Sequence, residues 1–475
     1  MKNTIKYIAF LLVGFIAFSA KAQVSDSTIQ ILTLEDLYGL VLQNHPLAKQ
    51  YDLLSEIAKQ DLRMARGGFD PKAEIDFNNK IFKDKNYYEL WNSYLKVPTW
   101  FGAEFKAGYE QNRGTNLSQQ ADTDSGNGLG YVGLSVPLGP ISKGFMMDYR
   151  RATLLQAQIG LDLAEADRLK EINKLLLKTA KGYWEWYFYY QQYKLLMNAY
   201  GLAVFRFDAV KIRIEQGDLA AIDSVQAKIT IQQRMVDLKT ANTQWRNATL
   251  MLSNYLWTED GIPLELDQSV VPIQTPLFEN TPDLPILLSF AQSNHPEIQK
   301  LNFKLAQLDV ERRLAAEMLK PEIKLKYNAL LKTPVDQQGV NSTTLSENYK
   351  FGFDFSVPLF LRKGRGKLGM VKAKQQQTTF KLDFQRQAIL NEISSNYNDL
   401  INLQEVLVIQ EAMVVNYQRM LAGERQLFRN GESTIFYVNV WENKLIESQV
   451  KLFSQRHKYA KAMAELLWSA GTIGN

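Results

Sequence analysis

The chain of 475 residues contains no cysteine, which excludes a disulfide scaffold, a thiolate metal site and a cysteine nucleophile. Its three histidines support no catalytic triad. The formal net charge is only +5, and it falls to +2 without the three lysines of residues 1–22, so no electrostatic argument favours nucleic acid as a partner. After those residues, no apolar run reaches the roughly 18 residues that a membrane-spanning helix needs. Any membrane-spanning part would therefore have to consist of strands.

The first 22 residues have the three parts of a secretory signal. Lys2 and Lys6 give a charged start, residues 8–18 form an apolar run, and residues 20–22 read Ala-Lys-Ala, as before a cleavage site. An apolar run of about 11 residues is too short for a transmembrane anchor, which needs about 20. We therefore expect residues 1–22 to be a signal peptide that directs export.

Proline is absent from two long runs, and these runs reveal a duplication. Residues 141–262 and 359–475 contain no proline. Strand-like alternation that ends in Ser-Val-Pro-Leu precedes each run, at 135–138 and 356–359, and Asn-His-Pro occurs further upstream, at 44–46 and 294–296. The sequence therefore predicts two repeats, 23–262 and 263–475, each with short helices, a β-strand pair and a long helical hairpin.

The predicted strands have one apolar, aromatic-rich face and one polar face. Phe351, Phe353 and Phe355 alternate with Gly352 and Asp354, and similar alternation occurs at 73–81, 129–137 and 322–329. Length and alternation are typical of strands that cross an outer membrane. Each repeat supplies two clear strands, and residues 93–113 leave open an extra hairpin. Because about eight strands are the fewest that close a membrane barrel, several chains would have to share one barrel.

The helical signals also occur in pairs. Thr33 and Asp36 predict a capping box that opens a short helix ending near Asn44, and Thr281 and Pro282 predict the start of its counterpart. His45 and His295 each precede a proline, which predicts a turn between two helices. Pairing these histidines as metal ligands is a weaker alternative. The aromatic run 183–190 indicates helix packing rather than a ligand platform.

Two glycines divide the long helical runs. The helix predicted from about residue 146 to 215 would be about 100 Å long at 1.5 Å per residue. Gly217 and Gly431 then interrupt the helical pattern at matching places, and a second long helix follows each of them. Narrow apolar stripes on such long helices require lateral packing against further helices.

Together these residues resemble the TolC-type outer-membrane efflux proteins over nearly the whole mature chain. The most specific piece is Gly-Asp-Leu-Ala-Ala-Ile-Asp-Ser-Val-Gln-Ala at 217–227, with its counterpart from Gly431. The resemblance implies a mainly α fold with β-structure: a homotrimer in which each protomer gives four strands to a 12-stranded outer-membrane β-barrel. That barrel would be continuous with an α-helical barrel that extends into the periplasm.

The resemblance also implies the site residues. Acidic residues six and nine positions after the turn glycine often line the constriction, and here Asp223 and Gln226 occupy these positions, whereas the second repeat has Tyr437 and Val440. Glu442 and Glu432 are the nearest acids there. The tip turns that would dock on a periplasmic adaptor comprise Gly217, Leu219, Ala220 and Ala221, and Gly431, Thr434 and Ile435.

The implied function is a passive exit duct in the outer membrane, the channel of a multi-component efflux or secretion system with an inner-membrane pump and a periplasmic adaptor (membrane fusion) protein. It would need no catalytic residue, metal or cofactor. The alternative is a periplasmic coiled-coil structural or adhesion protein without a channel. The sequence leaves open whether the cargo is a drug, a metal ion, a polypeptide or a siderophore.

Overall fold

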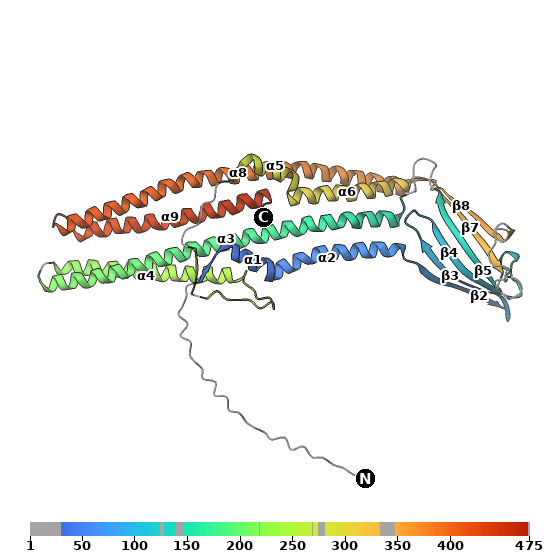
Figure 1. Cartoon of the computed structure of the whole chain (residues 1–475), viewed down its shortest axis with the longest axis horizontal. Coiled ribbons are helices and arrows are strands. Elements are labelled where there is room, and N and C mark those ends of the chain that lie inside the picture. The colour runs from blue at the N-terminus through green and yellow to red at the C-terminus, as the bar shows by residue number, and fades with distance from the viewer. Residues whose placement is uncertain are drawn as a thin grey trace, which may run out of the picture.

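The structure is a computed structural model, and it describes residues 30–123, 128–138, 147–217, 219–267, 269–273, 281–332 and 347–473. The predicted signal peptide, residues 1–22, lies outside these ranges, as does most of the polar stretch 333–348. A sheet occupies one end of the elongated molecule and the tips of two helical hairpins occupy the other (Figure 1).

Eight α-helices belong to the described residues, four in each half of the chain. They are α1 (Leu34–Asn44), α2 (Pro46–Arg66), α3 (Tyr149–Glu215), α4 (Ala221–Ser253), α5 (Leu284–Asn294), α6 (Pro296–Glu317), α8 (Arg362–Arg429) and α9 (Ile435–Ala470). The 67 residues of α3 and the 68 residues of α8 are each about 100 Å long at 1.5 Å per residue. Helix α2 runs beside α3, and α6 runs beside α8 (Figure 1).

The helix starts follow the predicted local chemistry. Thr33 Oγ1 accepts a hydrogen bond from the Asp36 N–H at 3.1 Å, and Asp36 Oδ2 accepts one from the Thr33 N–H at 3.2 Å, which completes the capping box. The first position of α2 is Pro46, as expected. The counterpart helix α5 begins two residues later than predicted, because Asp283 rather than Thr281 is its N-cap.

The two histidines before proline are helix caps. His45 Nδ1 accepts a hydrogen bond from the Leu47 N–H at 3.1 Å, and His295 Nδ1 accepts one from the Glu297 N–H at 3.2 Å. A ring nitrogen that accepts carries no proton, so the other nitrogen, Nε2, is the protonated one in the neutral ring. The duplicated Asn-His-Pro sequence therefore encodes a duplicated helix–helix elbow, and a cap rather than a metal ligand explains each histidine.

Within the described ranges, six strands form one antiparallel sheet in the order β2-β3-β4-β5-β7-β8. The strands are β2 (Lys72–Phe82), β3 (Lys85–Pro98), β4 (Glu104–Arg113), β5 (Leu129–Leu138), β7 (Glu322–Lys332) and β8 (Tyr349–Ser356). A separate two-stranded sheet pairs β1 (Gln30–Leu32) in parallel with β6 (Val270–Pro272), at the starts of the two halves. The expectation of four strands per chain needs correction, because β3 and β4 form the additional hairpin that the sequence left open, and it begins at residue 85 rather than 93.

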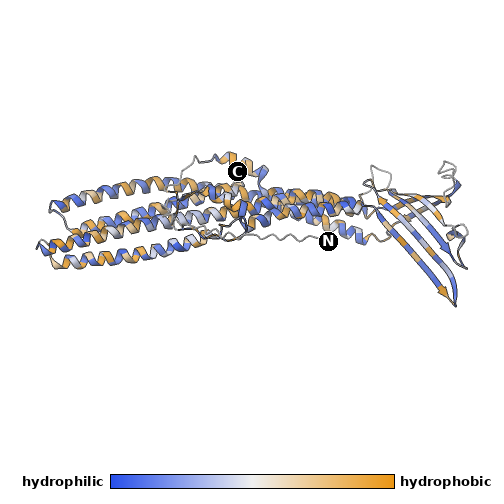
Figure 2. Ribbon diagram, turned by 60° about the horizontal axis from the view of Figure 1, so that its bottom comes forward, coloured by the Kyte–Doolittle hydropathy of each residue, from blue (hydrophilic) through white to orange (hydrophobic). Residues whose placement is uncertain are grey.

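The sheet has one apolar and one polar face. Register across the sheet places one row of side chains on one face, namely Lys72, Lys96, Lys106, Gly133, Asn328 and Lys350. The opposite face carries the large exposed apolar side chains Ile75, Phe77, Trp91, Phe105, Val132, Phe351, Phe353 and Phe355. Hydrophobic and hydrophilic residues are interleaved along the strands in Figure 2. The predicted strand faces are therefore correct, including the opposite directions of Phe353 and Asp354.

The main hydrophobic core lies midway along the helices. Tyr183, Trp186 and Tyr187 of α3 are fully buried there, and Tyr183 Oη donates a hydrogen bond to the Leu32 carbonyl at 2.8 Å. A second cluster in the other half centres on Ile393 and Leu400 of α8. The aromatic run thus packs helices together, as the sequence indicated. None of the helices in the described ranges is both long and apolar enough to cross a membrane.

His457 makes the stability of this helical region pH-dependent. Its Nδ1 lies 3.0 Å from the Trp184 carbonyl oxygen, and burial, together with nearby Lys461 and Lys458, lowers the pKa of His457 to about 4. In the unfolded chain the imidazole binds a proton near pH 6.5, so the unfolded state binds more protons between about pH 6.5 and 4. We expect the midpoint temperature of thermal unfolding, followed by circular dichroism, to decrease as the pH is lowered from about 6.5 to 4.

The variant His457→Gln should reduce, without abolishing, the dependence of the unfolding temperature on pH between about pH 4 and 6.5. Burial also lowers the pKa of His45 and His295, so these two histidines contribute with the same sign. Equal pH slopes for the variant and the parent protein would contradict the assignment to His457.

Candidate functional site

The tips of the two helical hairpins turn at the predicted glycines. Helix α3 ends at Glu215 and α8 ends at Arg429, and two residues later Gly217 and Gly431 have φ angles of 83° and 81°. This left-handed conformation favours glycine and ends a helix by reversing the chain. The glycine prediction is therefore confirmed at the level of backbone geometry.

Short exposed segments follow each turn. Ala220 and Ala221 are exposed and Leu219 is half-buried, and beyond them Ile222 is 70% exposed. In the second tip Thr434 is exposed, and the neighbouring Phe436 and Tyr437 are about half exposed. Each tip thus presents apolar side chains to its surroundings.

An ion-pair cluster joins the two hairpins behind the tips. Arg206 of α3 binds Glu442 of α9 through two hydrogen bonds of 2.6 and 3.1 Å, and it donates a third, of 2.6 Å, to Asn439 Oδ1. Arg425 of α8 approaches the same Glu442 carboxylate at 3.4 Å. We call Arg206, Arg425, Asn439 and Glu442 the tip latch. Its position is symmetric, because Arg206 lies 11 residues before Gly217 and Glu442 lies 11 residues after Gly431.

The tip latch is sheltered from water. The side chains of Arg206 and Glu442 are 19% and 12% exposed. A bidentate arginine–carboxylate pair at low exposure is stronger and more directional than a surface ion pair. At 1.5 Å per residue the latch lies about 16 Å from the turns. Closer to the turns, the guanidinium of Arg213 lies 5.9 Å from the ring centre of Phe428, a further contact between α3 and α8.

The predicted gate residues divide into two groups. Asp223 and Gln226 of α4 line a small cavity beside Arg206 and Asn439, so they lie next to the tip latch. Glu442 is a member of the latch, and its carboxylate is paired with arginines of the same chain rather than standing free. Glu432 lies exposed in the second tip turn, where its N–H bonds the Leu427 carbonyl at 2.9 Å. The structure therefore brings three of the four candidates together and leaves Glu432 apart.

Sequence reasoning missed the basic half of the cluster. It considered only residues that follow the turn glycines, whereas Arg206 precedes Gly217 by three helical turns. Arg234 of α4, which hydrogen bonds Asn443 of α9, was missed as well, because it lies 17 residues after Gly217, beyond the positions six and nine that were considered. The mirrored distances of Arg206 and Glu442 from the two glycines were the available signal, since opposite charges at equal distances from two adjacent tips can meet.

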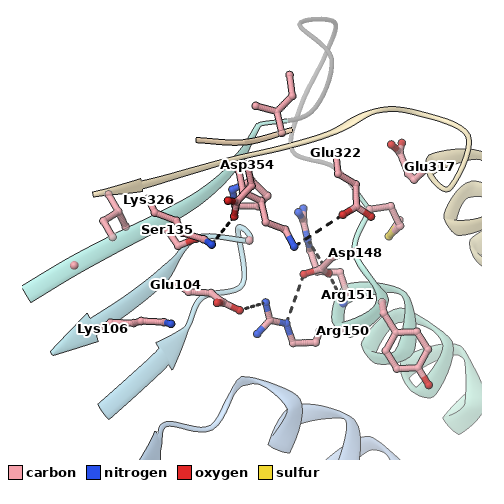
Figure 3. A pocket seen from close by; sticks show the side chains of 18 of the residues that line it. Glu104, Lys106, Ser135, Asp148, Arg150, Arg151, Glu317, Glu322, Lys326 and Asp354 are labelled. Carbon is pink, nitrogen blue, oxygen red and sulfur yellow. Dashed lines mark hydrogen bonds and ion pairs between the residues drawn. The ribbon is translucent and has the colours of Figure 1, made fainter. Parts of the chain in front are cut away.

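A second polar region lies where the sheet meets the helices. A cavity of about 500 Å³ opens against the polar face of the sheet and is lined by acidic and basic side chains from strands and helices (Figure 3). Arg150 of α3 binds Glu104 of β4 at 2.9 Å and approaches Asp148 at 3.6 Å. Asp148 also caps α3 by accepting from the Arg151 N–H at 2.8 Å. Charged groups thus link strand β4 of the sheet to the start of the long helix α3.

Comparison with solved structures shows what this fold is similar to. The outer-membrane channel MtrE of Neisseria gonorrhoeae, in an open state, matches with a TM-score of 0.65 and 15% identity over 92% of this chain and 88% of that one. CmeC of Campylobacter jejuni matches with a TM-score of 0.63 and 14% identity over 92% and 85%. The outer-membrane protein VceC of Vibrio cholerae matches with a TM-score of 0.62 and 16% identity over 92% and 96%.

Comparison with protein-family models finds a match in the second half of the chain. Residues 287–472 match the family model described as "Outer membrane efflux protein". No curated protein sequence is significantly similar to the chain. The family match over 287–472 and the common fold over more than nine-tenths of the chain agree with the resemblance that the sequence pattern predicted, and they show that the chain has the fold of these outer-membrane channels.

Proposed function

We propose that the protein is the outer-membrane channel of a multi-component efflux or secretion system, acting as a passive exit duct. One observation carries this function: a sheet with an apolar outer face and a charged inner face leads directly into helices about 100 Å long. The sheet has the pattern of a membrane barrel wall. The helices have the length to continue the duct into the periplasm.

The exposed apolar side chains of the long helices support assembly into a homotrimer. Phe205, Val236, Phe380, Phe384, Val408 and Ile409 are all more than half exposed in the single chain. Large exposed apolar surfaces mark sites of association. Neighbouring copies would cover these side chains and close the helices into a tunnel.

At the periplasmic end, the hairpin tips would dock on an adaptor protein that connects the duct to an inner-membrane pump. Gly217, Leu219, Ala220 and Ala221 in one tip, and Gly431, Thr434 and Ile435 in the other, are the docking residues in this proposal. The tip latch would hold the end closed, with Asp223 and Gln226 beside it. Docking could then open the tunnel by separating the two hairpins at the latch.

The proposed duct should behave as a trimeric channel. We expect the protein to require detergent for extraction, to have three times the mass of one chain by light scattering, and to produce conductance steps in planar bilayers. A monomeric protein that is soluble without detergent and forms no channel would instead support the alternative, a periplasmic coiled-coil protein.

The two faces of β8 should tolerate charge differently. Phe353→Arg and Phe355→Arg place a charge on the lipid face, where it costs roughly 2–4 kcal/mol at mid-bilayer, so both should block assembly of the oligomer. Asp354→Asn changes the opposite face and only removes a half-exposed ion pair with Lys326, which contributes little. The measurement is the yield of folded oligomer in outer membranes. Equal yields for all three variants would show that this strand does not contact lipid.

Breaking the tip latch should open the channel. Arg206→Met leaves the Glu442 carboxylate with only the longer Arg425 contact, and a hydrogen bond to a charged group contributes about 1.5–3 kcal/mol. The open fraction in bilayer recordings should therefore increase by about 10- to 100-fold.

Two further variants complete this experiment. Lys444→Met removes an ion pair with Glu447 that is more than half exposed on the same helix, so it should leave conductance unchanged. The exchange Arg206→Glu with Glu442→Arg should restore part of the closed state. An Arg206→Met trimer with the conductance of the parent would disprove the gating role.

A further inference from the structure

The extra hairpin of this chain is built into the middle of the sheet. Strands β3 and β4 lie between β2 and β5, and each of the two is paired on both sides. The β2–β3 pairing comprises 11 residue pairs and the β3–β4 pairing comprises ten. Removing the hairpin from the wall would therefore break the sheet between β2 and β5, so all six strands belong to one continuous wall.

Both edges of this sheet are open in the single chain. Strands β2 and β8 stand at the two ends of the strand order, and most of their residues are exposed. In a bilayer, an unpaired strand edge leaves backbone groups without hydrogen bonds, at a cost of several kcal/mol for each group. The edges must therefore find strand partners.

The two edges fit each other in direction. Neighbouring strands of the sheet are antiparallel throughout, so over six strands β2 and β8 run in opposite directions. A β8 edge placed against the β2 edge of another copy continues the antiparallel order. An even number of strands per chain allows this and an odd number would not.

The edges also fit in chemistry. On the polar face, β2 presents Lys72 and Asp76, and β8 presents Asp354 and Lys350. With Asp354 opposite Lys72, Lys350 lies opposite Asp76, and both pairs are of opposite charge. The apolar faces then align as well, because Phe353 lies opposite Ala73 and Phe351 opposite Ile75. Cross-strand pairs of these kinds stabilise antiparallel sheets.

We propose that β8 of each chain pairs with β2 of the next, so that three chains form one continuous barrel of eighteen strands, six from each chain. This rests on the proposed trimeric duct and deepens it. Because barrel diameter grows roughly linearly with strand number, this barrel would be about 1.5 times as wide as a twelve-stranded barrel.

Register at the joint is restricted to a few choices. A slip by one residue would turn the apolar residues toward the lumen, so only even shifts keep both faces continuous. Lys72 begins β2 and Ser356 ends β8, so these two strand ends lie beside the helices. If they lie at the same height in the barrel, Lys72 can be opposite either Asp354 or Ser356 of the neighbouring chain. In the second register Asp354 and Lys72 become diagonal neighbours, but Asp354 then lies directly opposite Glu74, so like charges make this register the less favourable of the two.

The absence of native cysteine allows a direct test of this joint. The double variant Glu74→Cys with Gly352→Cys places thiols opposite each other in the first register, and Glu74→Cys with Asp354→Cys does so in the second. Directly opposite residues of antiparallel strands have Cα atoms about 4.5–5.5 Å apart, which suits a disulfide. We expect one of the two variants, oxidised in outer membranes, to run as covalent dimers and trimers on non-reducing denaturing gels.

Glu74→Cys with Ser135→Cys is the matched control. Ser135 lies on the same face, but its strand β5 is paired on both sides within the chain, so no crosslink between chains should form. A trimer by light scattering in which neither edge pair crosslinks would overturn the eighteen-stranded joint while leaving the duct intact. A protein that is monomeric throughout would overturn the proposed function and the joint together.

Discussion

The need to satisfy backbone hydrogen bonds at the two edges of the sheet governs the rest of this structure. Within one chain, β2 and β8 each have a partner on one side only. Lipid offers their free edges no hydrogen bonds, so one chain cannot be stable in a membrane alone. In the proposed duct, assembly is consequently part of folding, and it would also bury the exposed apolar side chains of the long helices, such as Phe384 and Val408.

Local chemistry made much of the fold predictable from the sequence. The Thr33 capping box, the His45 and His295 elbows and the two tip glycines each depend on residues within a few positions of one another, and each occurs where expected. Alternation likewise revealed the strands with one purely apolar face, such as β8. These features required no knowledge of distant contacts.

Strand β3 was harder to recognise because its polar face carries aromatic residues. Tyr94 lies on that face, opposite Glu74 on one side and Gly108 on the other, and its hydroxyl bonds Glu74. A Cβ on Gly108 would lie only 2.7 Å from side-chain atoms of Tyr94 and Tyr131. The missing side chain of Gly108 thus makes room for two rings on the polar face. Aromatic residues on the polar face hide the alternation by which a strand is recognised. Their pairing with a glycine is visible only when the three strands are aligned.

The tip latch was not predicted because its partners are 236 residues apart, and only their equal distances from the two turn glycines relate them in the sequence. Midway along the helices, Tyr183, Trp186 and Tyr187 fill a tightly packed core, and separating helices there would expose large buried rings. Beyond the small cluster of Leu196, Ala199, Ala241 and Ile446, polar contacts increasingly hold the hairpins together. Regions with few buried apolar contacts open at the lowest free-energy cost. In the proposed duct, this packing gradient along the helices therefore favours opening at the tips over opening midway along the molecule.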